Sequence, residues 1–277
     1  MNWLRKLLTW IFALRDAWRG EEKKKVNEGD FKLDIKQDKK DGRDYEKPVL
    51  VKLLLPSKID YAEFVPPIKN QGSIGSCGSH AAATGLEMIQ NMKEPKWSIP
   101  LSELFHYYVV RKDYEMTFPD DSGQHGREAM KVMHQVGVTP EKLYPYNTDN
   151  FNTEPRLWAL VKSMARFWKI TAYERCYSLQ AIKTAVKEQK AVWLGVPVRR
   201  NIFDYKSGIL TYNKNYGAVG GHAMLVCGYD DEKKALKLAN SWGTGWGEKG
   251  YGWMSYDYLY GVEWFDAWAF DLVPRGY

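Results

Sequence analysis

Residues 71–92 read QGSIGSCGSHAAATGLEMIQNM, a loop rich in Gly and Ser that runs into a helical pattern. The apolar positions after Cys77 recur at helical spacing and predict a buried helix: Ala82, Leu86, Ile89 and Met92. Ser76 suits the N-cap, which would place Cys77 in the first turn, where free backbone N–H groups and the helix dipole favour a nucleophilic thiolate. A buried structural thiol is the ordinary alternative. However, the glycines Gly72 and Gly75 let other groups approach the sulfur.

Two distant segments supply further chemistry. Residues 220–229 read GGHAMLVCGY, and residues 240–251 read NSWGTGWGEKGY. His222 lies 145 residues after Cys77, and Asn240 lies 18 residues after His222. That order and spacing are typical of a cysteine nucleophile paired with a histidine and an asparagine. Each residue alone is weak support, because a lone histidine before an apolar strand is more often structural. The specificity comes from the three motifs together.

With these motifs the chain resembles papain-like cysteine peptidases, and most closely the compact bacterial and viral members that lack a long inhibitory pro-domain. Residues 55–72 (LPSKIDYAEFVPPIKNQG) resemble the start of the mature enzyme, and LSELFHYY, DSG and GVTPEKLYPY follow in the order of the bacterial branch. The resemblance covers roughly residues 48–272. It implies a two-lobed α+β fold, with Cys77 on a helical left lobe and the histidine and asparagine on a β-barrel-like right lobe. The active-site cleft would lie between the lobes.

These residue types suit amide hydrolysis through an acyl-enzyme. Cys77 would attack the carbonyl, and His222 would hold the thiolate as an ion pair and then protonate the leaving amine. Asn240 would fix the orientation of the histidine ring. The backbone N–H of Cys77 and the side-chain amide of Gln71 would form the oxyanion hole. The expected function is a cysteine endopeptidase acting on polypeptides. Peptide ligation or isopeptide cleavage on the same machinery, and a tethered binding module, are the alternatives.

The resemblance also implies substrate-binding positions. Ser122 and Gly123 would offer backbone hydrogen bonds to an extended substrate, and Trp242 would shield the bond between asparagine and histidine from water. One departure concerns Gly78, because the family usually has an aromatic residue immediately after the nucleophile. A glycine there opens the first helical turn and removes a packing group near the cleft.

The sequence divides into an N-terminal part, residues 1–47, and a peptidase domain, residues 48–277. Residues 1–19 predict a basic amphipathic helix. Its apolar run is too short for a transmembrane span or a signal peptide, which favours docking on a membrane surface or a partner protein over packing on its own body. Residues 20–47 carry mixed charges and predict a solvated linker. Alternating apolar residues at 31, 33 and 35 leave room for a short extended piece, and self-inhibition by this segment is a weaker hypothesis.

The hydrophobic period changes along the peptidase domain. Helical patterns come first and apolar or alternating runs come later, which is typical of an α+β protein. The predicted helices lie within residues 101–112, 127–136 and 178–190. The predicted strands lie within residues 191–198, 220–230, 234–242 and 250–259.

Composition narrows the class of protein. The first 60 residues carry 15 Lys and Arg against 11 Asp and Glu, and the rest of the chain is nearly balanced, so no nucleic-acid groove is indicated. Three cysteines predict free thiols at Cys176 and Cys227 and a reducing, cytoplasmic setting, with peripheral membrane association through residues 1–19 as an option. The pair Cys77 and His80 lacks a second pair at metal-ligand spacing, and no phosphate-binding or dinucleotide motif occurs, so neither a metal nor a cofactor is expected.

Overall fold

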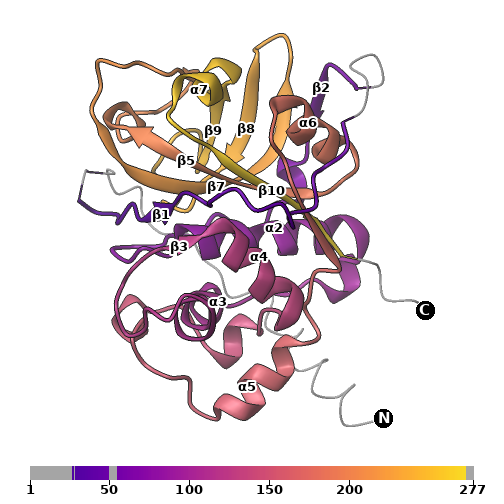
Figure 1. The fold of residues 1–277 in the computed structure, drawn as a ribbon, viewed down its shortest axis with the longest axis vertical. Helices are drawn as coiled ribbons and strands as arrows, with labels where there is room; N and C mark the ends of the chain where they lie inside the picture. Colours follow the sequence, from indigo (N-terminus) through magenta and orange to yellow (C-terminus); the bar gives the residue numbers. More distant parts are fainter. Residues whose placement is uncertain (1–26, 28, 50–54, 273–277) are drawn as a thin grey trace.

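The computed structural model describes residues 27, 29–49 and 55–272. The helix predicted over residues 1–19, with its role at a membrane surface or on a partner, lies outside the described residues. No helix in the described part of the chain is long and apolar enough to cross a membrane. Figure 1 shows a lobe of helices and a lobe built on a sheet, with α2 between them. The two-lobed α+β organisation is therefore confirmed.

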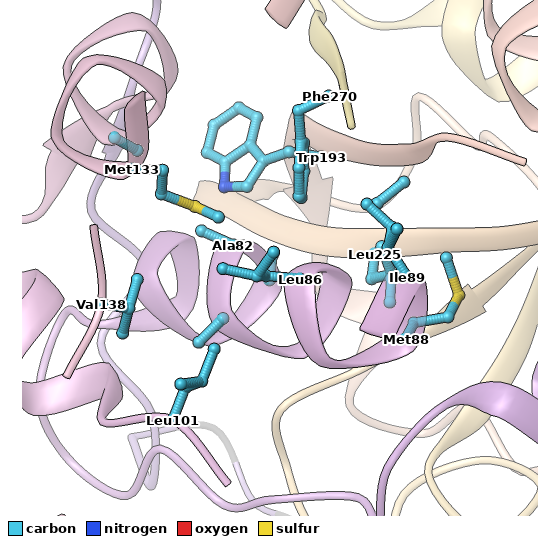
Figure 2. Packing of buried hydrophobic residues seen from close by; sticks show 14 of the residues in the cluster. Ala82, Leu86, Met88, Ile89, Leu101, Met133, Val138, Trp193, Leu225 and Phe270 are labelled. Carbon is cyan, nitrogen blue, oxygen red and sulfur yellow. The ribbon is translucent and has the colours of Figure 1, made fainter. Parts of the chain in front are cut away.

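Helix α2 (Cys77–Lys93) packs against both lobes. Its apolar positions are buried as the spacing predicts, except that Met92 is only partly buried. Figure 2 shows the helix beside the buried sheet residues Trp193, Leu225 and Phe270. Ser76 stands at the N-cap position but makes no capping bond with its side chain. Its hydroxyl lies instead 2.7 Å from that of Tyr146, so the start of the helix is tied to the loop that carries Tyr146.

The helical lobe contains the helices predicted within residues 101–112 and 127–136, which are α3 (Glu103–Val109) and α4 (Gly126–Gln135), together with α5 (Trp158–Ala165), which was not predicted. Ser102 caps α3 by accepting from the backbone N–H of Phe105, and a π-helical turn, η4 (Val110–Tyr114), continues it. Short 3₁₀ turns complete the connections: η2 (Ala62–Phe64), η3 (Pro95–Trp97), η5 (Glu141–Leu143) and η6 (Thr148–Asn150).

The other lobe is organised around one mixed sheet. Its strand order is β4-β10-β5-β7-β8-β9-β6, and β2 also pairs with β7. Among the described residues the two ends of this order do not pair, so the sheet is open, whereas a barrel-like closure was expected; one end strand, β6, has only two residues. The strands are β2 (Lys58–Asp60), β4 (Ala172–Arg175), β5 (Ala191–Arg199), β6 (Ile209–Leu210), β7 (Ala218–Asp230), β8 (Ala235–Ala239), β9 (Tyr251–Ser255) and β10 (Asp266–Asp271).

Two helices and a 3₁₀ turn, η7 (Arg200–Ile202), accompany the sheet. Helix α6 (Leu179–Lys187) was predicted and begins at Ser178, whose side chain accepts from the backbone N–H of Ala181. The strand expected over residues 250–259 was wrong in its second half. Only β9 pairs with β8, and the chain then continues as helix α7 (Tyr256–Gly261). All three cysteines are free and buried, as expected for Cys176 and Cys227.

The N-terminal segment over residues 29–47, here called the arm, departs from the expectation of a solvated linker. Strand β1 (Ile35–Lys36) pairs in parallel with β3 (Gln124–His125), which supports the alternative of a short extended piece. Figure 1 shows the indigo arm running between the sheet and helices α2 and α4. Ile35, Asp38 and Lys47 are buried by these contacts. The arm therefore lies in the groove where the two lobes meet.

Candidate active site

Cys77 is the first residue of α2 and is completely buried. Burial raises the pKa of its thiol to about 12, while the backbone N–H groups of Ala223 and Gly78 act in the opposite direction as hydrogen-bond donors to the sulfur. The nearby Asp34 carboxylate of the arm adds to the rise in the pKa. Because Ala223 directly follows His222 in β7, the sulfur lies at the histidine strand of the other lobe.

His222 is held by Asn240. The histidine Nε2 lies 2.7 Å from Asn240 Oδ1, which also accepts from the backbone N–H of Ser241 at 2.8 Å. Because an amide oxygen only accepts, Nε2 carries the proton and Nδ1 is the atom free for chemistry. Nδ1 has no hydrogen-bond partner within the described part of the chain. Burial lowers the pKa of this imidazole to about 4.

The β7–β8 hairpin explains how two residues 18 positions apart come together. The strands are antiparallel, with Leu225 opposite Ala239, so the chain returns to Asn240 beside the strand that carries His222. Trp242 covers the pair: its ring lies 4.7 Å from the His222 ring between centroids. The shielding role expected of this tryptophan stays a prediction, and this contact is consistent with it.

Gln71 is buried at the start of the loop that leads to Cys77. Its Oε1 accepts from the Ser241 hydroxyl at 2.8 Å, which fixes the direction of the amide. Its Nε2 donates to the carbonyl of Ile74 at 3.1 Å and to the carbonyl of Lys32 at 3.3 Å. The structure thus brings Gln71 next to the residue that follows Asn240, although 170 positions separate the hydrogen-bonded pair.

The arm crosses this site. The Phe31 ring stacks on Trp242 with centroids 4.8 Å apart and planes inclined by 12°. The carbonyl of Asp34 lies against Gly123, where a β-carbon would come within 1.9 Å of its oxygen and φ is +66°. Only glycine leaves room for a chain there. Gly123 therefore lies where an extended backbone passes, while the Ser122 hydroxyl turns away to bond Thr117 Oγ1 at 2.6 Å.

The arm also fills an apolar hollow. Ile35 is only 5% exposed and belongs to the same buried cluster as Trp193 and Cys77. A β-carbon at Gly195 would lie 3.0 Å from Ile35 Cγ2, so the absence of a side chain at 195 makes the hollow. One aliphatic side chain of the arm therefore fills this hollow in the cluster that contains Cys77.

Charged residues fasten the arm on both sides of the hollow. Lys36 Nζ lies 3.2 Å from Glu115. Asp38 Oδ2 accepts from Arg175 at 3.1 Å and from the Trp268 indole at 2.8 Å, and the backbone N–H of Arg127 in the first turn of α4 lies 3.0 Å away. Burial raises the pKa of Asp38, while these donors act in the opposite direction. The sequence did not predict these contacts of Asp38. The alternation of Phe31, Leu33 and Ile35 indicated only that the arm could be extended.

Comparisons with known proteins match most of the chain. A family model described as papain family cysteine protease matches residues 55–263. An uncharacterized peptidase C1-like protein of Acanthamoeba polyphaga mimivirus is 28% identical over 203 residues, which cover 69% of this chain and 64% of that protein. Zingipain-2 of Zingiber officinale is 28% identical over 201 residues, covering 71% of this chain and 86% of that protein. The chain thus spans less than two thirds of the length of the mimivirus relative.

Solved structures share the fold. Xylellain, a cysteine protease from Xylella fastidiosa, superposes with a TM-score of 0.79 at 29% identity, over 92% of this chain and 100% of that chain. A cysteine protease of Carica candamarcensis in complex with E-64 gives a TM-score of 0.63 at 22% identity, over 79% of this chain and 100% of that chain. The second likeness concerns the fold alone.

Proposed function

Because the chain belongs to the papain family of cysteine proteases, we propose that it is a cysteine endopeptidase that cleaves polypeptides through Cys77, His222 and Asn240. One observation carries the proposal: the buried sulfur at the start of α2 lies beside the backbone N–H of Ala223, while Asn240 turns the adjacent histidine so that Nδ1 has no partner among the described residues. A nucleophile, a base and the group that orients the base thus meet from three distant parts of the chain.

The chemical step follows from this arrangement. The thiolate of Cys77 forms a bond to the carbonyl carbon, and the carbonyl electrons move onto oxygen. The imidazolium Nδ1–H then gives its proton to the amine, and the C–N bond breaks. Water, losing a proton to Nδ1, attacks the thioester and restores the thiolate and imidazolium. Asn240 serves by keeping Nε2–H occupied, so that Nδ1 faces the reacting atoms.

Gln71 is proposed to stabilise the oxyanion together with the backbone N–H of Cys77. The Ser241 hydroxyl holds Oε1, so the NH₂ group points the other way. There it meets the carbonyl of Lys32 in the arm, a group of the same type as a substrate carbonyl. Preorganised donors of this kind supply on the order of 3 kcal/mol of transition-state stabilisation each.

We further propose that residues 1–47 regulate a peptidase domain of residues 48–277, and that the described arm holds the enzyme latent. The arm lies on Gln71, Gly123 and Trp242, which are three of the positions assigned to catalysis or substrate. With the arm in place, burial favours the neutral forms of both Cys77 and His222. Access of water after release of the arm would allow the ion pair to form. Residues 1–19 are proposed to tether the chain to a membrane surface or a partner.

The test is labelling with a peptidyl epoxide, followed by mapping of the modified residue. We expect modification at Cys77, loss of labelling in Cys77→Ala, and retained labelling in the matched variant Cys227→Ala. A chain without residues 1–47 should label faster than the full chain. Labelling that persists in Cys77→Ala overturns the assignment of the nucleophile, and equal rates with and without residues 1–47 overturn self-inhibition.

Product analysis separates the remaining alternatives. Hydrolysis of a peptide in the presence of added amines gives free acid, whereas a ligase or acyl transferase gives the amide of the added amine. An isopeptidase prefers branched over linear substrates, and a binding module produces neither product while still binding peptide. We expect the free acid of a linear peptide.

A further inference from the structure

The residue after the nucleophile is a glycine, and another side chain fills the space beside it. A β-carbon at Gly78 would lie 2.7 Å from Nε2, and 2.9 Å from both Cδ and Cγ, of Gln124. Gln124 is completely buried. We propose that Gln124 is a positioning residue. It replaces the missing side chain at 78 and fixes the distance between the substrate-binding edge, strand β3, and the sulfur of Cys77. This inference rests on the peptidase function proposed above.

A hydrogen-bonded relay holds the end of the Gln124 side chain. Ser79 Oγ lies 2.7 Å from Gln124 Oε1 and 2.8 Å from His106 Nδ1, and His106 Nε2 lies 3.0 Å from the carbonyl of Ala129. A carbonyl only accepts, so Nε2 carries the proton. Burial lowers the pKa of His106 to about 4, so Nδ1 is unprotonated at neutral pH and accepts the single proton of the Ser79 hydroxyl.

The relay decides which end of the Gln124 amide faces Ser79. The hydroxyl proton is already given to His106, so Ser79 Oγ must accept from Gln124. The two ends of a carboxamide are nearly identical in shape, so the positions of Oε1 and Nε2 given above can be exchanged. Turning the NH₂ group toward Ser79 in this way satisfies a buried donor that otherwise has no partner in the described part of the chain. The relay then runs from Ala129 in α4 through α3 and α2 to β3, and it joins three helices to the edge strand.

The backbone of Gln124 lies in the edge strand β3. In β3 it pairs with Ile35 of the arm, directly after Gly123, so it belongs to the edge along which an extended chain lies. The Trp193 indole also donates to the carbonyl of Gly78 at 2.9 Å. The first turn of α2 is therefore in contact with both Trp193 and Gln124. A shift of Gln124 would change the distance between a bound peptide and the sulfur.

The test uses the full chain and two reagents that both modify Cys77. A peptidyl epoxide lies along the edge strand, whereas iodoacetamide is too small to contact it. Both reagents need the arm to open, so the ratio of their rates cancels any change in opening. In Gln124→Ala we expect the rate of epoxide labelling divided by the rate of iodoacetamide labelling to fall about tenfold, because a small misplacement of reacting groups has effects of that order.

Gly78→Ala is the second substitution of a double-mutant cycle. Its methyl group would displace Gln124, so the ratio should fall in the wild-type background, whereas in Gln124→Ala the methyl has room and should cause no further fall. Gln124→Met keeps the length of the side chain but loses the relay, and a ratio between those of the wild type and Gln124→Ala is expected.

Gln90→Ala is the matched control, because Gln90 is a buried glutamine on the same helix, away from the first turn. Its ratio should equal that of the wild type even if the variant is less stable. Equal ratios in Gln124→Ala and the wild type, or additive effects in the cycle, would overturn the inference. Failure of the proposed function looks different, because then the peptidyl epoxide would not modify Cys77 even in the wild type.

Discussion

The main-chain carbonyl of Lys32 lies 3.3 Å from Gln71 Nε2 and accepts a hydrogen bond from it. The same amide is the proposed side-chain donor to the oxyanion. The arm and a reacting substrate therefore compete for one donor, and the closed protein satisfies its oxyanion donor with its own backbone. If the arm inhibits as proposed, this contact would keep the oxyanion donor from a substrate while the arm is in place.

Phe31→Ala should loosen the arm. The stacked ring on Trp242 is a contact of the arm that makes no use of the nucleophile. Loss of an aromatic pair, about 1 kcal/mol beyond the lost burial, should raise the rate of epoxide labelling of the full chain about fivefold. Tyr45→Ala is the control, because that arm residue is 80% exposed and its loss should leave the rate unchanged. Equal rates for the two variants would contradict the role of Phe31.

The His222 ring should titrate differently with and without the arm. Burial lowers its pKa to about 4, so in the full chain the ring remains neutral until the pH falls through that value. In a chain without residues 1–47 we expect an imidazolium at pH 6, held by the thiolate. The chemical shifts of the ring in NMR spectra report the charge. A neutral ring at pH 6 in both proteins would contradict this expectation.

Gln71→Ala should slow the chemical step while leaving binding nearly intact. Removal of one oxyanion donor typically lowers kcat about a hundredfold or more. Steady-state kinetics of a chain without residues 1–47 would measure this, with KM expected to change little. Ser241→Ala removes only the hydroxyl that orients the Gln71 amide, so a smaller loss is expected. A loss that is larger in Ser241→Ala than in Gln71→Ala would be inconsistent with these roles.

Asp266 should make the stability depend on pH in an unusual direction. Burial raises its pKa to about 6, although the backbone N–H of Asp38 and the charge of Arg175 act in the opposite direction. A carboxyl group with a higher pKa in the folded state binds a proton on folding. Its contribution to the free energy of unfolding is therefore complete below about pH 4 and is lost as the pH rises through 6.

Urea unfolding at a series of pH values measures this contribution. Between pH 4 and pH 7 the difference in unfolding free energy should shift in favour of Asp266→Asn over the wild type. Asp149→Asn, at an exposed position, is the control and should show no such shift. A constant difference for Asp266→Asn across the range would show that the carboxyl group does not take up a proton on folding.

The hollow that holds Ile35 should select substrates. Its floor is glycine at position 195, and the Trp193 ring belongs to the same apolar cluster. Peptide libraries should therefore show enrichment of Ile, Val or Leu at the residue bound there. Gly195→Ala would shorten the hollow by one carbon and should shift the preference toward smaller side chains. An unchanged profile in this variant would place the preferred residue elsewhere.

Much of the framework could be predicted because its signals are local. The apolar period after Cys77 is a property of one helix, and the alternating runs after residue 190 are properties of single strands. The conjunction of the cysteine, histidine and asparagine motifs brought distant segments into one hypothesis before any contact was known. The end of the strand at Ser255 was missed, because the pattern that continues into α7 is equally apolar.

The path of the arm could not be predicted in the same way. Asp38 accepts a hydrogen bond from Trp268, which is 230 positions away. Such a contact produces no hydrophobic periodicity in the sequence around Asp38. Its charges gave the segment the composition of a solvated linker, although several of them are partnered inside the protein. The role of Gln124 was hidden for a related reason. Gly78 indicated that a side chain was missing, but not which distant residue takes its place.

The order of the parts along the chain has a consequence for synthesis. At about 5–20 residues per second, the 145 residues between Cys77 and His222 take the ribosome roughly 7–30 s to add. During that interval the thiol has emerged without its base. The arm precedes both of them, so it is already available when the last strands complete the fold. If the arm inhibits as proposed, a newly made molecule would therefore fold directly into the closed state.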